Sequence, residues 1–236
     1  MKESAAKKKV LVIDVGGTHV KILASGQKEM REIDSGPSMT PSRMVQQVKA
    51  LAKDWEYDAV SIGYPAPVVH GRPFHEPYNL GDGWVGFDFK KAFGCPVRII
   101  NDAAMQALGS YQGGRMLFLG LGTGLGSAMI VDGIVEPMEL AHLPYKKKTY
   151  EDYLGVRGLE WLGKKQWRRE VAKVAEMLLG AMEVDYVVLG GGNVKKLKEL
   201  PPKARAGDNR NAFLGGFRLW DPSAASDADP HTTTTQ

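Results

Sequence analysis

The sequence predicts an α/β fold built from two similar halves, and three observations support that prediction. Short β-branched apolar runs alternate with stretches of helical periodicity, which is typical of α/β proteins. The succession of strand, glycine turn and strand occurs twice, at residues 10–23 and again at 116–131. The chain has 236 residues, 43% of them hydrophobic and 25% charged, which suffices for the core of one large domain or two small ones.

The first half opens with a strand and a glycine turn. Val10–Asp14 is a β-branched apolar run that ends at Gly16-Gly17, and residues 20–23 continue as a second strand. Thr40-Pro41 predicts a helix start, because threonine caps a helix and proline suits its first position. Apolar residues at helical spacing over 44–52 extend that helix.

Further along the first half, another strand leads into a long loop. Ala59–Gly63 is a short buried strand, and His70–Gly86 is rich in glycine, proline and polar residues without periodicity. Long loops in compact domains are usually functional or disordered. Val97–Ile100 then predicts a strand, and Ala103–Tyr111 predicts a helix.

The second half repeats the opening pattern. Strands are expected at Met116–Leu119 and Ser127–Val131, on either side of the glycine turn Gly120–Gly126. Apolar residues on one face predict a long helix through residues 171–182. A strand at Tyr186–Leu189 then enters a glycine turn, which we expect to be followed by a lysine-rich helix.

We expect two lobes joined near Gly113-Gly114. The N-terminal lobe is predicted at residues 9–112 and the C-terminal lobe at 113–222. Residues 1–8 are expected to form a flexible basic tail. Residues 223–236 are small and polar and end in four threonines, so we expect them to be disordered.

Composition narrows the possible partners and compartments. The net charge of +4 fits either solvated helix faces or an attraction for polyanions such as nucleic acid, ATP or inorganic polyphosphate. Aromatic residues are not interleaved with the basic runs, so no nucleic-acid partner is expected. No apolar stretch reaches about 18 residues, which argues against a membrane span. The run 10–15 is too short for a signal peptide, and one cysteine, Cys95, forms no internal disulfide, so a cytoplasmic protein is expected.

The first glycine turn has the residues of a phosphate site. Gly16 and Gly17 allow backbone amides to approach a phosphate closely, and Thr18 adds a hydroxyl donor. Asp14 before the turn can hold Mg²⁺ directly or through water, and Lys21 ends the motif. An ordinary hairpin turn explains these residues equally well.

The second glycine turn favours the phosphate interpretation. Residues 120–126, with Gly122, Thr123 and Gly124 at the centre, again join two apolar strands. Walker loops and dinucleotide fingerprints precede helices, so neither motif fits. Two such hairpins, one opening each half, predict a duplicated architecture that clamps a nucleotide between its lobes.

Three weaker signals add candidate side chains. Asn101-Asp102 follows a strand at its carboxyl end, where ligands bind in open α/β sheets. Asp102 can accept a proton there. In isolation, helix capping is the stronger explanation of these two residues. Glu139 and His142 could converge on hydroxyl groups, although a surface ion pair explains them better alone. Gly191 and Gly192 could face a nucleotide, although a plain turn explains them almost as well.

Taken together, these motifs resemble the actin-like ATPase superfamily, whose ribonuclease H-like fold has two duplicated lobes around a central cleft. Within it the chain is most similar to the short glucokinase and polyphosphate glucokinase branch of the ROK sugar kinases. The resemblance covers roughly residues 9–220. Residues 150–153 and 211–216 resemble that short branch specifically.

The resemblance assigns roles to individual residues. Asp14-Val15-Gly16-Gly17-Thr18 resembles the family's first phosphate motif, and Gly122-Thr123-Gly124 its second. The sugar-contacting positions of the family correspond to Gly63, Asn79, Asn101, Asp102, Glu139 and His142. Asp102 matches the catalytic aspartate.

The resemblance implies a glucokinase that transfers a phosphoryl group from polyphosphate, ATP or both to the 6-hydroxyl of glucose. Asp102 is then the general base, and Mg²⁺ lies near Asp14. The zinc-binding cysteines found in many members are missing, so no zinc is expected and His142 has no zinc role. Ala141 replaces the family's usual glycine, which either shifts the turn or is tolerated.

Two rival functions follow from the same resemblance. The protein could phosphorylate a different hexose or an amino sugar, or it could be a non-catalytic sugar-binding regulator. Regulators of the family carry a helix-turn-helix before the kinase-like part, and only about eight residues precede the first strand here. Members are often dimers, so a homodimer is compatible with the resemblance.

Overall fold

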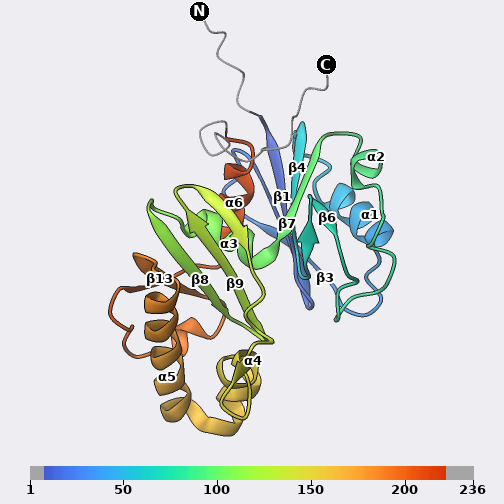
Figure 1. Cartoon of the computed structure of the whole chain (residues 1–236). Helices are drawn as coiled ribbons and strands as arrows, with labels where there is room; N and C mark the ends of the chain where they lie inside the picture. The colour runs from blue at the N-terminus through green and yellow to red at the C-terminus, as the bar shows by residue number, and fades with distance from the viewer. Residues whose placement is uncertain (1–7, 222–236) are drawn as a thin grey trace, which may run out of the picture. The chain divides into compact units, whose positions relative to one another are not determined.

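The computed structural model describes residues 8–221 (Figure 1). The expected tails at 1–8 and 223–236 therefore lie outside the described residues, apart from Lys8. Contacts group the described chain into two compact units. Unit 1 runs to Asp102 and includes Gly216–Trp220, and unit 2 is Ala103–Gly215. The lobes expected at 9–112 and 113–222 remain a prediction, because grouping by contact does not test which parts move together.

Unit 1 contains a five-stranded sheet in the order β3-β2-β1-β4-β7. β1 pairs antiparallel with β2 and parallel with β4, and β4 pairs parallel with β7. The side chains of β4 are all buried. The elements of unit 1 are β1 (Val10–Val15), β2 (His19–Ala24), β3 (Arg31–Asp34), α1 (Pro41–Leu51), β4 (Ala59–Tyr64), β5 (Val68–Val69), β6 (Arg72–Pro73), α2 (Phe89–Phe93) and β7 (Val97–Asn101).

The start of α1 confirms the sequence prediction. Thr40 is the N-cap, its side chain accepts a hydrogen bond of 3.4 Å from the amide of Arg43, and Pro41 is the first helical residue. Met44, Val45 and Val48 on one face of α1 are buried in the core of unit 1. Burial of that apolar face fixes the helix against the sheet.

Unit 2 contains a second five-stranded sheet in the order β10-β9-β8-β13-β14. The helix α5 contacts β13 and shares the core of the unit (Figure 1). The remaining elements are α3 (Asp102–Ser110), β8 (Arg115–Leu121), β9 (Leu125–Val131), β10 (Ile134–Pro137), β11 (Pro144–Tyr145), β12 (Lys148–Thr149), α4 (Tyr150–Leu154), α5 (Val156–Ala181), β13 (Tyr186–Gly190), a 3₁₀ turn (Val194–Lys196), β14 (Ala204–Ala206) and α6 (Asn211–Arg218).

The two sheets have the same strand order and the same directions. In each, three antiparallel strands come first, and two further strands are added parallel to the first one. The glycine turn lies between the first two strands of each unit, at Gly16–Thr18 and Gly122–Gly124. The duplicated α/β architecture predicted from these turns is therefore confirmed.

Unit 1 is completed by residues from near the end of the described chain. The hydroxyl of Ser61, which is fully buried on β4, donates a hydrogen bond of 2.6 Å to the carbonyl of Gly216. The same hydroxyl accepts a hydrogen bond of 2.9 Å from the indole nitrogen of Trp220. A β-carbon at Gly216 would lie 2.3 Å from a methyl of Val12, so only glycine allows this approach.

The lysine-rich helix expected after β13 was a wrong prediction. Only Val194–Lys196 forms a 3₁₀ turn, and Leu197 is already extended. The carbonyl of Lys196 accepts a hydrogen bond of 2.6 Å from the guanidinium of Arg168, and Pro201-Pro202 follows soon after. Proline cannot continue a helix, and the carbonyl of Lys196 is already bonded to a side chain of α5.

Among the helices within residues 8–221, none combines the length and the apolar character that a bilayer crossing needs.

Candidate active site

The glycine turn of unit 1 is held by hydrogen bonds that its carbonyl groups accept, while two of its amides take part in no described hydrogen bond. The amide of Gly16 donates to the carbonyl of His19 at 3.0 Å. Ser35 donates its hydroxyl to the carbonyl of Gly16 at 2.5 Å and its amide to the carbonyl of Thr18 at 2.8 Å. Gly17 and Thr18 are exposed, and no hydrogen bond described for residues 8–221 uses their amides as donors. Such a turn offers main-chain donors to an anion.

Asp14 lies just before this turn, in the middle of the sheet. It pairs in register with Lys21 on β2 and with Gly63 on β4. Burial raises the pKa of the Asp14 carboxyl to about 6, and the positive charge of Lys21 limits that rise. The carboxyl is therefore mainly ionised at neutral pH and offers a negative charge beside the phosphate turn.

Asn79 is brought to the same turn by a loop that the sequence left as functional or disordered. A β-carbon at Gly17 would lie 3.1 Å from the β-carbon of Asn79, so the two residues are in contact. The loop is anchored by Trp84, which is fully buried, and by Glu76, whose carboxylate accepts the amides of Trp84 and Val85, each at 3.0 Å. The loop is therefore ordered, and it places a predicted sugar contact against a predicted phosphate contact.

Asn101 is the last residue of β7, and Asp102 directly after it is the first residue of α3. The side-chain amide of Asn101 donates to the main-chain carbonyls of Tyr64 and Ala66 at 3.5 and 3.3 Å, which ties β7 to the end of β4 and the segment after it. Because β1, β4 and β7 run parallel, their carboxyl ends lie at one edge of the sheet. Asp102 is thus at the edge where the strand carrying Asp14 also ends.

The glycine turn of unit 2 is held in the same manner. The side-chain amide of Asn193 donates to the carbonyl of Gly122 at 3.1 Å, and the amide of Val156 donates to the carbonyl of Thr123 at 3.1 Å. Thr123 is exposed, and no hydrogen bond described for the residues of the structure uses the amides of Thr123 or Gly124 as donors. Both units therefore present a turn with engaged carbonyls and available amides.

The turn after β13 packs on this second turn. Gly191 has a φ of 83°, and a β-carbon there would lie 2.6 Å from the carbonyl carbon of Leu121. The amide of Asn193 donates to the carbonyl of Leu121 at 3.0 Å. Gly192 is exposed, and an added β-carbon would meet nothing within 4 Å. Gly191 thus supports the turn, and Gly192 leaves open space beside it.

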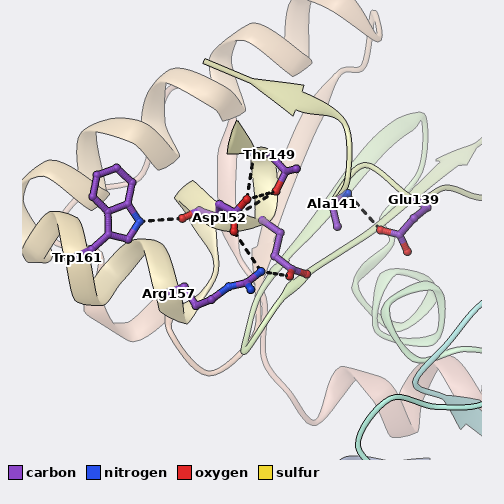
Figure 2. Close-up of polar contacts among 7 residues, drawn as sticks. Glu139, Ala141, Thr149, Asp152, Arg157 and Trp161 are labelled. Carbon is purple, nitrogen blue, oxygen red and sulfur yellow. Dashed lines mark hydrogen bonds and ion pairs between the residues drawn. The ribbon is translucent and has the colours of Figure 1, made fainter. Parts of the chain in front are cut away.

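Glu139 and His142 lie on unit 2, and both residues are exposed. A carboxylate oxygen of Glu139 accepts a hydrogen bond of 3.2 Å from the amide of Ala141, as Figure 2 shows. Ala141 is only 3% exposed, so its methyl group is packed in the core and the turn accommodates it. The carbonyl of Ala141 accepts the amide of Glu151 at 3.0 Å.

Glu151 and Arg157 were given no role by the sequence motifs. An added β-carbon at Gly124 would lie 2.5 Å from a carboxylate oxygen of Glu151, which places that side chain at the second turn. Arg157 forms an ion pair of 2.7 Å with Glu151. Residues 150–153 stood out only by resemblance, and no spacing rule connects position 151 to position 124.

Within residues 8–221 no group of three or more histidine, cysteine, aspartate or glutamate side chains could hold a metal ion. Mg²⁺ needs no such group, since it is commonly bound by one or two carboxylates together with substrate phosphates. Asp14, beside a phosphate-type turn, fits that mode of binding.

Comparisons with known proteins find similar sequences and structures. A family model described as "ROK family" matches residues 10–137. The polyphosphate glucokinase of Mycobacterium tuberculosis (strain CDC 1551 / Oshkosh) is 27% identical over 214 residues, which cover 80% of either chain.

Solved structures share the fold. The inorganic polyphosphate/ATP-glucomannokinase of Arthrobacter sp. strain KM matches with a TM-score of 0.75 at 22% identity, over 90% of this chain and 98% of that one. A ROK family transcriptional regulator, described as a homologue of the E. coli MLC protein, matches with a TM-score of 0.71 at 15% identity, over 93% and 79%. The actin-like ATPase fold expected from the two turns is thereby confirmed.

Proposed function

The chain belongs to the ROK family, and from that membership we propose that it is a sugar kinase whose acceptor is the 6-hydroxyl of glucose and whose donor is polyphosphate, ATP or both. The contact between Gly17 and Asn79 carries this proposal. It joins, within unit 1, a turn suited to phosphate and the loop expected to hold the sugar. A kinase needs its donor and its acceptor close together.

The donor is held through main-chain groups of both turns. The amides of Gly17 and Thr18 on unit 1 and of Thr123 and Gly124 on unit 2 are the ones available to its phosphates. Gly16 and Gly122 use their own amides to shape the turns, and Lys21 adds a positive charge. Gly191 and Gly192 accompany the second turn and contact a nucleotide when ATP is the donor. Such preorganised donors stabilise charge that spreads over the phosphoryl oxygens as transfer proceeds.

The proposed sugar contacts are polar side chains. Asn79 and Asn101 belong to unit 1 and Glu139 and His142 to unit 2, while Gly63 lies on β4 opposite Asp14. Amide, carboxylate and imidazole groups together offer the donors and acceptors that a sugar's hydroxyls require. Specificity for one hexose arises when another sugar would leave these polar groups without hydrogen-bond partners.

Asp102 acts as the general base. Its carboxylate accepts the proton of the 6-hydroxyl while that oxygen forms a bond to the terminal phosphorus of the donor. The bond from that phosphorus to the bridging oxygen breaks, and the electron pair leaves with ADP or with the shortened polyphosphate. Positioned general bases typically contribute about 10²–10⁴ in rate.

Mg²⁺ is held by Asp14 together with the donor's phosphates. When bound, it neutralises phosphate charge and so favours transfer. The Asp14 carboxyl, with its pKa of about 6, is mainly ionised at neutral pH, which is the form that binds a cation.

Polyphosphate use is supported by the chain's net charge of +4 and by the similarity to the M. tuberculosis polyphosphate glucokinase. The test is formation of glucose 6-phosphate by the purified chain with ATP and, separately, with polyphosphate at matched phosphate concentration. Absence of product with both donors would refute a glucokinase.

The same assay addresses the alternatives. The relative named glucomannokinase makes mannose the first rival acceptor, so a panel of hexoses and amino sugars should be run with each donor. A chain that binds a sugar without phosphorylating any of them would be a regulator instead, as the neighbouring transcriptional regulator allows.

A further inference from the structure

A carboxylate lies beside the second glycine turn, where the proposed donor is an anion. The carboxylate oxygen of Glu151 is 2.5 Å, and its carboxylate carbon 3.2 Å, from the position of a β-carbon added at Gly124. The Glu151 side chain is 23% exposed, so solvent screens it only in part. Left alone, this charge would repel a phosphate held by the amides of Thr123 and Gly124.

Arg157 neutralises that charge. Its guanidinium lies 2.7 Å from a carboxylate oxygen of Glu151 and 3.2 Å from one of Asp152, and Figure 2 shows it reaching toward both α4 carboxylates. Arg157 itself is 61% exposed at its side chain, and it lies on the first turn of α5. The guanidinium is therefore positioned by the two acids.

Asp152 is itself fixed, which makes the arrangement rigid. Its carboxylate accepts the hydroxyl of Thr149 at 2.7 Å and the amide of Thr149 at 3.2 Å, completing the capping box that starts α4. The carbonyl of Asp152 accepts the indole nitrogen of Trp161 at 3.1 Å (Figure 2). Arg157 thus has one well-anchored partner and holds Glu151 through its second contact.

The start of α5 touches the turn as well. The amide of Val156 donates to the carbonyl of Thr123 at 3.1 Å, and a β-carbon at Gly155 would lie 2.8 Å from the same carbonyl oxygen. Position 157 is therefore linked to the turn in two ways. It follows Val156, whose amide bonds to the turn, and it contacts the Glu151 side chain, which lies at the turn.

We propose that Arg157 is a positioning residue for the phosphoryl donor: by pairing with Glu151 it cancels the negative charge beside Gly124 and keeps the second turn able to bind phosphate. This rests on the proposed kinase function. Arg157 acts through Glu151, since its guanidinium is already shared between two carboxylates. The proposal concerns the donor and not the sugar.

The decisive variants form a double-mutant cycle. Arg157→Gln keeps much of the side-chain length, removes the charge, and is expected to raise the KM for ATP or polyphosphate about tenfold. The KM for the sugar should change less than about twofold. In a chain that already carries Glu151→Gln, the further change Arg157→Gln should raise the donor KM less than about twofold, because the carboxylate beside Gly124 is already gone. Equal effects of Arg157→Gln with and without Glu151→Gln would overturn the proposal.

Two controls separate this effect from others. Arg169→Gln removes an exposed arginine further along α5 and should leave the donor KM unchanged. Because exposed ion pairs contribute little to stability, Arg157→Gln should unfold at nearly the wild-type urea concentration. Activity of the wild-type chain establishes the kinase function first; an active wild type with an unaltered Arg157→Gln variant refutes this inference alone.

Discussion

The side-chain amide of Asn193 donates a hydrogen bond of 3.1 Å to the carbonyl of Gly122 and thereby joins the turn after β13 to the turn after β8. Asn193 is only 9% exposed, and its carbonyl oxygen accepts the ammonium of Lys196 at 2.7 Å. A side chain at the edge of one turn therefore determines the shape of another, more than sixty residues away in the sequence.

Replacing Asn193 by alanine is expected to loosen the second phosphate turn. It removes a buried hydrogen bond and leaves the carbonyl of Gly122 without that donor, so stability should fall by about 1–2 kcal/mol. The donor KM should rise while the sugar KM stays near wild type. Urea unfolding and steady-state kinetics measure the two effects. Lys195→Ala, an exposed neighbour, is the control, and identical behaviour of the two variants would contradict the role given to Asn193.

Asp102→Asn is expected to lower kcat by about 10²–10⁴ because an amide cannot accept the hydroxyl proton. Sugar affinity, measured by calorimetry or fluorescence titration, should be largely kept, since asparagine preserves size and hydrogen bonding. Asp132→Asn is a matched control on the exposed β9–β10 hairpin, where the φ of 50° suits asparagine. Wild-type turnover in Asp102→Asn would show that another group is the base.

The pKa of Asp14 predicts a pH dependence. Burial raises that pKa from 3.8 to about 6, so the folded chain holds this proton more tightly than the unfolded chain does. The contribution of Asp14 therefore makes the free energy of unfolding decrease as the pH rises between about 4 and 6. The Asp14→Asn variant lacks this contribution. Unfolding of both proteins across that pH range measures the difference, and parallel profiles would contradict the assignment.

The same ionisation should control donor use. Below about pH 6 the Asp14 carboxyl is mainly protonated, and a protonated carboxyl is a poor ligand for the Mg²⁺ that we propose it binds. The kcat/KM for the donor should therefore decline as the pH falls through that value. Asp14→Asn should be less active at every pH and should not show this decline.

Alanine is expected to affect stability differently at the neighbouring positions Gly191 and Gly192. Alanine at position 191 meets the backbone of Leu121 at 2.6 Å and requires a φ of 83°, so Gly191→Ala should destabilise unit 2 by more than about 1 kcal/mol. Alanine at position 192 meets nothing within 4 Å, so the free energy of unfolding of Gly192→Ala should equal that of the wild type. Equal stabilities in urea would show that the turn is not packed as described.

Much of the fold could be predicted because its signals are local. β1, the cap at Thr40 and the strand β4 each follow from the residues that form them. The strand β14 was missed because Ala204–Ala206 is only three residues long and has no β-branched or aromatic side chain; it is a strand because β13 offers a parallel partner. The glycine-rich helix α6 was missed for a similar reason, since its glycines allow close contact with α3: a β-carbon at Gly215 would lie 1.8 Å from the carbonyl oxygen of Met105.

The candidate site likewise combines residues with local sequence signals and residues that only the fold brings together. The glycine turns and Asn101-Asp102 are contiguous in sequence, so motif spacing identified them. Ser35, Asn193, Glu151 and Arg157 support those turns from distant positions, and only the folded chain brings them there. The proposed substrate contacts could thus be named from the sequence, whereas the residues that support the turns could not.

The hydrogen bonds of Ser61 have a consequence for how the protein is made. During translation, the N-terminal unit emerges from the ribosome long before Gly216 and Trp220, and until then the buried hydroxyl of Ser61 on β4 lacks both native partners. Nascent chains arrested before residue 216 should consequently be more sensitive to protease in their first hundred residues than chains released past residue 220.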